Sequence, residues 1–233
     1  MSGAWEEAWA VDIPRAPRHI RVMRRRALIA ALSLALTPAL AAAQPRPVPL
    51  TPQDQADLQR IQAYLNGVRS LHARFLQVAP DGRTSEGQAW LVRPGRMRFQ
   101  YDPPAPFLLV AGGGILTFYD GSLKQTSNIP LGSTPLSILL ADQVNLASGT
   151  LTVTDFRRLP GQLQVSLTRT ASPQEGTLTL IFADPPLTLR QWVILDAQGK
   201  RTSVTLYDVQ LGGTYDPGLF HFIDPRFFGN NPG

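Results

Sequence analysis

Cysteine is absent from this chain, and that absence excludes several kinds of chemistry. Without cysteine there is no disulfide, no thiol nucleophile and no cysteine-ligated metal. A lipid-modified cysteine that could anchor an exported protein is excluded too, so we expect the mature chain to be soluble. Histidine is also scarce, and neither His72 nor His221 lies beside a nucleophile or at a metal-ligand spacing. We therefore expect no catalytic residues, no metal site and no other cofactor.

The N-terminal region has the pattern of a secretory signal peptide. A short apolar run at residues 27–36 follows three arginines and precedes three alanines at 41–43. The run is too short for a membrane span, and Pro38 interrupts the apolar stretch soon after it. This order of basic, apolar and small residues predicts a signal peptide at residues 23–43.

Residues 1–22 do not fit that pattern, because a basic leader should not begin with acidic side chains such as Glu6 and Glu7. They are either the product of a misassigned start, with Met23 as the true first residue, or a leader extension. Residues 44–233 remain as one domain, and their length is sufficient for a sizeable core.

The basic balance of the whole chain comes largely from its N-terminal region. Six of the 22 basic residues and three of the 17 acidic residues precede Gln44, which leaves a net charge of +2 for the mature part. A nearly neutral exported domain lacks the electrostatic footprint of a nucleic-acid-binding protein. We therefore exclude nucleic acid as a partner.

Two segments of the mature chain carry helix signals. Thr51 and Pro52 are typical of a helix start, and a stripe at helical spacing follows them: Leu58, Ile61, Leu65 and Val68. A second Thr-Pro pair at 134–135 predicts a short helix that carries Leu136, Ile138, Leu139 and Leu140. Those leucines are either ordinary core residues or the apolar face of a mobile lid.

The rest of the chain alternates like β-strands separated by turns. Turn signals occur at residues 80–82, 112–114, 120–121, 160–161 and 198–199. The pattern predicts a mainly β (α+β) fold with about eleven strands, and such a sheet would be ~50 Å wide. Two helices, each about 10 Å across, cannot cover its apolar face unless the sheet curls into a barrel that is closed or nearly so. The interior is then either a lidded apolar cavity or a core packed by its own side chains.

One strand-turn-strand unit contains an arginine in an apolar row. Leu91 and Arg93 share a face of the strand before the Pro-Gly turn at 94–95, and after that turn Met97, Phe99 and Tyr101 share a face. We expect Arg93 to point into the apolar concavity, where an unpaired charge is costly. Arg93 therefore either has a permanent bonding partner there, or makes a contact that breaks during function.

Four other arginines allow two interpretations. Arg96, Arg98, Arg157 and Arg158 could share a solvated outer face, or they could form a basic patch that docks acidic partners or anionic lipid head groups.

Several motifs together resemble the LolA family of periplasmic lipoprotein carriers, over residues from about 57 to 225. The motifs are Ser70-Leu71-His72-Ala73-Arg74-Phe75-Leu76-Gln77, Gly87 with Trp90-Leu91-Val92-Arg93-Pro94, Thr134-Pro135-Leu136, and Asp216-Pro217-x-x-Phe220-x-Phe222 with Asp224-Pro225. The resemblance implies an unclosed, strongly curved antiparallel β-barrel with a helical lid. It also implies a cavity that shields lipoprotein acyl chains during transfer from the inner to the outer membrane.

The resemblance also implies roles for individual residues. Arg93 matches the arginine whose hydrogen bonds to the lid hold the unloaded form shut, and we term it the lid latch. Met97 and Phe99 match cavity positions, and with them we expect Leu91, Tyr101 and Leu109 to line the acyl-chain cavity. The family expects an aromatic residue near Met97, so methionine makes this wall more adaptable. We expect the lid to carry the leucines and isoleucine of both helices: Leu58, Ile61, Leu65, Leu136, Leu139 and Leu140.

The partners implied by the resemblance are lipoprotein acyl chains, an inner-membrane ATP-driven release complex, and an outer-membrane acceptor lipoprotein or the outer membrane itself. We expect a periplasmic monomer. Two other functions stay open. One is a periplasmic sensor or adaptor that binds lipids or lipoproteins without transporting them, and the other is an esterase-like enzyme with an unrecognised site.

Overall fold

The structure is a computed structural model, and it describes residues 46–224. The predicted signal peptide at 23–43 and the segment 1–22 lie outside the described residues. The described residues all belong to one compact unit, Ala42–Gly233.

The described chain forms one antiparallel sheet of eleven strands, which confirms the predicted mainly β fold. The strands are β1 (Ser70–Val78), β2 (Thr84–Val92), β3 (Arg96–Tyr101), β4 (Phe107–Gly112), β5 (Ile115–Asp120), β6 (Gln125–Pro130), β7 (Leu151–Leu159), β8 (Gln162–Arg169), β9 (Gly176–Ala183), β10 (Thr188–Asp196) and β11 (Arg201–Leu211). Their spatial order is β6-β5-β4-β3-β2-β1-β11-β10-β9-β8-β7. The sheet is curved and unclosed, because β6 and β7 form its two edges and do not pair with each other.

The topology consists of two meanders joined by one long-range pairing. Strands β1 to β6 follow one another across the first half of the sheet, and β7 to β11 do so across the second half. Only the antiparallel pairing of β1 with β11 connects the halves, with Phe75 opposite Leu206. Short hairpins at the predicted turns link consecutive strands, whereas the segment between β6 and β7 carries the second predicted helix.

Helix α1 (Pro52–Gly67) begins as its sequence predicts. The Thr51 side chain accepts a hydrogen bond from the Asp54 amide, and the Asp54 carboxylate accepts one from the Thr51 amide. This reciprocal cap satisfies two amides that a helix start would otherwise leave unpaired. The second helix, α2 (Leu136–Leu139), is a single turn that follows a 3-10 turn, η2 (Leu131–Ser133). Its N-cap is Pro135 rather than the threonine before it.

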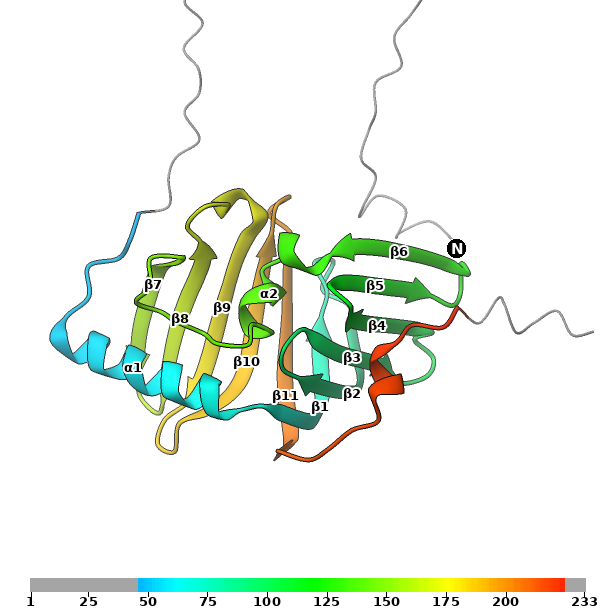
Figure 1. Cartoon of the computed structure of the whole chain (residues 1–233), viewed down its shortest axis with the longest axis horizontal. Coiled ribbons are helices and arrows are strands. Elements are labelled where there is room, and N and C mark those ends of the chain that lie inside the picture. Colours follow the sequence, from blue (N-terminus) through cyan, green and yellow to red (C-terminus); the bar gives the residue numbers. More distant parts are fainter. Residues whose placement is uncertain (1–45, 225–233) are drawn as a thin grey trace, which may run out of the picture. The chain divides into compact units, whose positions relative to one another are not determined.

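Both helices cover the same face of the sheet, which we call the inner face. Figure 1 shows α1 lying across β7 to β10, with α2 beside it over the middle of the sheet. The alternating apolar residues of almost every strand lie on this face and form one core cluster with the helices. Leu163, Val165 and Leu167, which alternate along β8, are part of it. Burial of this apolar surface is the main force that holds the helices on the sheet.

The outer face of β3 to β5 is covered by the C-terminal segment. Phe220 ends the 3-10 turn η4 (Pro217–Phe220) and is almost fully buried. Arg98 donates a hydrogen bond to the Leu219 carbonyl (3.2 Å), and the Arg96 guanidinium lies over the Phe220 ring. A Cβ at Gly112 would stand 2.2 Å from the Phe220 carbonyl oxygen, so this strand end requires glycine for the close approach.

Gly87 on β2 provides a test of packing on the inner face. A Cβ at this position would lie 2.1 Å from the Gln100 carbonyl oxygen and 2.7 Å from the Phe75 ring. We expect Gly87→Ala to lower the free energy of unfolding by about 1–3 kcal/mol, because overpacking displaces backbone as well as side chains. Urea denaturation measures the change. Gly67→Ala is the matched control, since a Cβ there meets no atom within 4 Å, and an equal loss in both variants would contradict the prediction.

Candidate functional site

Arg93 lies directly after β2, and its side chain is buried between the sheet and the helical cover. Only 4% of the residue is exposed. Its Nε donates a hydrogen bond to the Leu139 carbonyl (2.9 Å), and its Nη1 donates one to the Leu65 carbonyl (2.6 Å). One guanidinium therefore contacts both helices of the cover at once.

Both accepting carbonyls belong to helix ends. Leu65 lies in the last turn of α1, and Leu139 is the last residue of α2. Carbonyls in a last helical turn have no partner within their own helix, and the C-terminal end of a helix attracts a cation. Helix α1 has no basic residue in its own last turn, so Arg93 supplies that cation from the sheet. The adjacent turn contributes a further contact, because the Gly95 amide donates to the Leu140 carbonyl (2.9 Å).

The charge of Arg93 is held at an electrostatic cost. Burial lowers the pKa of Arg93 to about 10, and repulsion from Arg69 acts in the same direction, while Asp142 partly opposes both. The side chain remains charged at neutral pH, and it forms no ion pair with any residue that the structure describes. Carbonyl dipoles, together with the charge of Asp142, thus compensate a desolvated guanidinium, so the contact is strong while it is intact and its partial loss is costly.

A second set of hydrogen bonds joins α1 to the loop that follows α2. The Asn66 side chain donates to the Val144 carbonyl (2.9 Å) and accepts from the Val144 amide (2.8 Å). The Gln62 side chain accepts from the Leu146 amide (2.8 Å), and Arg69 forms an ion pair with Asp142 (2.7 Å). The two helices and this loop therefore form one connected helical cover. The sequence does not predict these contacts, because a single polar side chain on a helix gives no indication of a distant backbone partner.

The N-terminal half of α1 is attached to the sheet by ion pairs. Arg158 on β7 binds Asp57 (2.6 Å) and Asp54 (2.9 Å), and Arg60 binds Asp184 (2.6 Å) and Asp57 (2.8 Å). Asp57 is nearly buried. Burial acts to raise the pKa of Asp57, but hydrogen bonds from Arg158 and Arg60 outweigh it and hold that pKa below its ordinary value.

These ion pairs correct one hypothesis from the sequence. Arg96 and Arg98 lie on β3 and face the C-terminal segment, whereas Arg157 and Arg158 lie on β7 at the edge of the other half-sheet. Arg158 lies on the inner face against α1, and Arg157 pairs with Asp155 (2.7 Å). The four arginines therefore do not gather into one patch. The sequence could not reveal this, because alternation within a strand says nothing about which strands are neighbours.

The residues predicted to line a cavity all lie on the inner face. Leu91, Met97, Phe99 and Tyr101 are each less than a tenth exposed, and Leu109, opposite Phe99 on the neighbouring strand, is half-buried. The Tyr101 hydroxyl donates to the Gln77 side chain (2.8 Å), and burial raises the pKa of Tyr101. Gln77, the last residue of the sequence motif at 70–77, is thus a polar group on this face.

Aromatic side chains extend this wall further than the sequence predicted. Ring contacts run from Trp192 to Phe99, Phe75, Tyr101, Phe107 and Phe118, with ring centroids 4.6 to 6.0 Å apart along the row. The row crosses strands β10, β3, β1, β4 and β5. Phe75 stood in a motif noted in the sequence, but its place beside Phe99 depends on the pairing of β1 with β2 and of β2 with β3.

The residues predicted to form the lid pack against these wall residues. Leu58, Ile61 and Leu65 project from α1, and Leu136, Leu139 and Leu140 come from α2 and its end; each is less than a tenth exposed. All six belong to the same core cluster as Leu91, Met97 and Phe99. The structure thus brings the predicted latch, wall and lid residues together, with the apolar side chains of wall and cover buried against one another.

Within residues 46–224, no group of three or more histidine, cysteine, aspartate or glutamate residues is placed to hold a metal ion. In that same part of the chain, no helix has the length and hydropathy needed to cross a membrane.

The sequence region that contains the latch, the wall strands and α2 matches a known family. A family model described as "Outer membrane lipoprotein carrier protein LolA" covers residues 66–223. The chain belongs to the LolA family. The match includes Arg93 and every predicted wall residue, whereas most of α1 precedes it.

The names of two relatives agree with this assignment. The outer-membrane lipoprotein carrier protein of Methylococcus capsulatus is 31% identical over 175 residues, which are 71% of this chain and 83% of that protein. That of Pseudomonas aeruginosa is 29% identical over 189 residues, covering 74% of this chain and 86% of the relative. A solved LolA superfamily structure from Nitrosomonas europaea aligns with 70% of this chain and 97% of its own length, at 10% identity and a TM-score of 0.40.

The ion pairs of α1 give this LolA-family protein a pH-dependent stability. Since the pKa of Asp57 is lowered in the folded state, its stabilising effect is complete above the ordinary aspartate pKa of about 3.9 and is lost as pH falls through the lowered value. We expect Asp57→Asn to lower the free energy of unfolding at neutral pH, and the gap to the unmodified protein to shrink as the pH falls below the ordinary aspartate pKa of about 3.9. Urea titrations across that range measure the gap. In Asp155→Asn, which breaks an exposed ion pair, the gap should be small throughout; a pH-independent effect of Asp57→Asn would refute the assignment.

Proposed function

We propose that this protein is a periplasmic carrier that shields the acyl chains of lipoproteins between the inner face of the sheet and the helical cover, and transfers them from the inner to the outer membrane. The family match and the names of the relatives support lipoproteins as cargo. In this proposal the helical cover is the lid, and the structure represents the closed, unloaded form.

The observation that carries the proposal is the position of Arg93. Arg93 is buried between apolar surfaces and bonded only to carbonyls at the ends of two helices. Such a contact is a poor way to stabilise the fold, because apolar packing would hold the same helices without a desolvation cost. It suits a contact whose hydrogen bonds form and break together when the lid closes and opens. Opening the lid exposes the guanidinium to water, which offsets part of the hydrogen-bond energy that is lost.

The inner face has the chemistry needed for acyl chains. Its centre is apolar and aromatic, and Met97 gives it a flexible, polarisable side chain that adapts to chains of different shape. Each methylene removed from water contributes roughly 0.8 kcal/mol, so an acyl chain gains several kcal/mol when it replaces the lid against this wall. The same arithmetic explains why free acyl chains do not cross an aqueous compartment unshielded.

A carrier must also release what it binds. When the lid is held shut, the free energy of opening is subtracted from the intrinsic affinity for cargo, which weakens the observed binding. Charge-assisted hydrogen bonds contribute about 1.5–3 kcal/mol each, which is the right size for this adjustment. We infer that an inner-membrane ATP-driven release complex loads the carrier, and that an acceptor lipoprotein or the outer membrane itself receives the cargo.

The direct test is release of lipoproteins from spheroplasts into solution. Purified protein is incubated with spheroplasts that make a labelled lipoprotein, and the supernatant is examined by gel filtration. A carrier yields a soluble complex with the lipoprotein. If the lipoprotein stays with the membrane whenever this protein is present, the carrier function is wrong, and depletion that alters only signalling would favour a sensor or adaptor.

The first variant to test is Arg93→Leu, which removes both hydrogen bonds to the lid while keeping an apolar side chain. We expect it to shift the lid toward opening by about tenfold or more. Cargo should then bind at least as tightly as to the unmodified protein, but transfer to outer membranes should be slower, since the closed state no longer competes with cargo. Arg157→Leu, at an exposed arginine, is the control. Normal transfer by the Arg93 variant would contradict the role of Arg93 as the lid latch.

A second pair of variants tests whether α2 acts as the lid. Leu139→Asp places a charge on the buried side of the helix, where it would face acyl chains. We expect weaker binding of a hydrophobic fluorescent probe, measured by titration. Leu123→Asp makes the same change at a leucine that is 47% exposed and should leave the affinity unchanged. If the Leu139 variant binds the probe as tightly as the unmodified protein does, α2 has only a structural role and is not a lid.

A further inference from the structure

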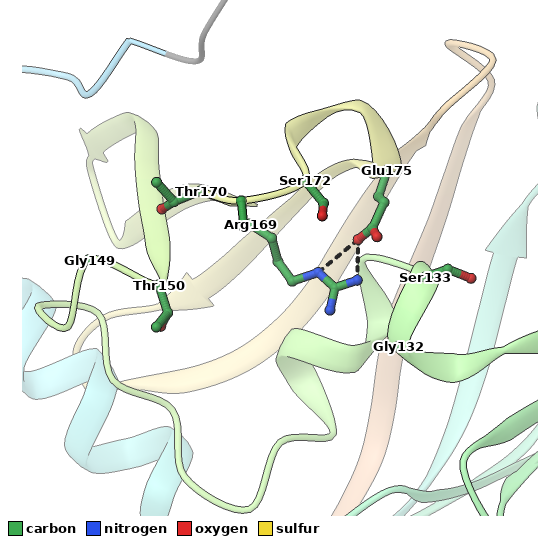
Figure 2. A pocket seen from close by; sticks show the side chains of 9 residues that line it. Gly132, Ser133, Gly149, Thr150, Arg169, Thr170, Ser172 and Glu175 are labelled. Carbon is green, nitrogen blue, oxygen red and sulfur yellow. Dashed lines mark hydrogen bonds and ion pairs between the residues drawn. The ribbon is translucent and has the colours of Figure 1, made fainter.

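A pocket outside the apolar core opens where the cover meets the ends of the second half-sheet. Its volume is about 680 Å³, within the range of pockets that hold drug-sized ligands. Figure 2 shows that η2 borders it on one side and the loop between β8 and β9 on the other. Gly132, Gly149 and Thr150 also line it.

The charges of this pocket cancel. Arg169, at the end of β8, donates through Nε to the Glu175 carboxylate (2.7 Å), and its Nη2 contacts the same oxygen. No other charged residue lines the pocket. An anionic head group would have to compete with Glu175 for the only cation, so the lining favours a neutral ligand that forms hydrogen bonds.

Hydrogen-bonding capacity nevertheless remains on these side chains. Among the residues that the structure describes, Nη1 of Arg169 has no acceptor and the hydroxyl of Ser172 has no partner. In Figure 2 both side chains lie beside Glu175 in the pocket. The pocket therefore offers donors suited to carbonyl oxygens, together with a carboxylate oxygen suited to an amide.

A second, smaller pocket of about 270 Å³ adjoins the first and shares Thr150 and Arg169 with it. It lies against the cover, where its apolar lining includes Ile138, Val144 and Leu151. Ile138 and Val144 are themselves buried members of the core cluster. From the first pocket to the second, the lining thus changes from polar and neutral to partly apolar, on the side of the core that lies beneath the helical cover.

We propose that the Arg169–Glu175 pocket binds the neutral, carbonyl-rich junction of a lipid-modified peptide, where ester-linked acyl chains join the first peptide units. This inference rests on the proposed carrier function and deepens it. The acyl chains enter beneath the lid past the smaller pocket, and the ester and amide groups take hydrogen bonds from Arg169 and Ser172. The pocket thereby distinguishes a lipoprotein from a free fatty acid, which has no such junction.

The test compares two fluorescent probes on the purified protein. One is a synthetic peptide whose N-terminal cysteine carries a thioether-linked dipalmitoylglyceryl group, and the other is a fluorescent palmitate. The first variant is Arg169→Gln combined with Glu175→Gln, which removes the ion pair without leaving an unpaired charge. The second is Gly132→Leu, which fills the pocket, since a Cβ at Gly132 meets no atom within 4 Å. Arg157→Gln, on the neighbouring strand, is the matched control.

We expect both variants to bind the lipopeptide about fivefold more weakly, the loss typical of one neutral hydrogen bond, and to bind palmitate as the unmodified protein does. Unchanged lipopeptide affinity in both variants overturns the inference and leaves the carrier function standing. An equal loss for both probes also overturns it, because the pocket would then act only through the apolar cavity. Selective loss of binding to phosphatidylglycerol vesicles would identify an anionic head-group site instead. Failure of the unmodified protein to bind either probe refutes the carrier function itself.

Discussion

The arrangement of this molecule depends on one buried guanidinium. Arg93 lies at the seam between the sheet and its cover, and its two hydrogen bonds reach the ends of both helices. Those helix ends carry carbonyls that have no amide partner within their own helix, and Arg93 supplies the hydrogen-bond donors for them. Because the charge is desolvated and without an ion-pair partner in the described chain, the contact is stable only while both carbonyls are in place.

The helical cover is attached by different chemistry at its two ends, and this difference is relevant to the proposed opening of the lid. The N-terminal half of α1 is attached through ion pairs with Arg158 and Asp184, in which the arginines contact water and the aspartates are largely buried. The C-terminal half and α2 are held by Arg93, by the hydrogen bonds from the Gly95 amide to Leu140 and from the Leu189 amide to the Tyr64 hydroxyl, and by apolar packing against the wall. Loss of the Arg93 contact would therefore free α2 and the end of α1 first, while the ion pairs still hold the rest of the helix.

Much of the fold could be predicted from local patterns. The start of α1, the strand count and the predicted hairpins follow from the residues themselves, since caps, alternation and turn residues act over a few positions. The inward direction of Arg93 also followed from alternation. Its partners did not, because Leu65 and Leu139 contribute only backbone carbonyls, and any residue could stand there.

Local sequence patterns therefore predict the fold class, the helix signals and the presence of a charge in an apolar row, because each is a short-range property. Which residues act together depends on the tertiary structure. The pairing of β1 with β11 brings Trp192 of β10 to the aromatic row of the other half-sheet, and the ion pairs of Arg158 remove it from the supposed basic patch. The neutral pocket at Arg169 likewise forms only where η2 meets the β8–β9 loop. These sites are assembled from segments far apart in the chain, and long-range packing, which leaves no periodic trace in the sequence, brings them together.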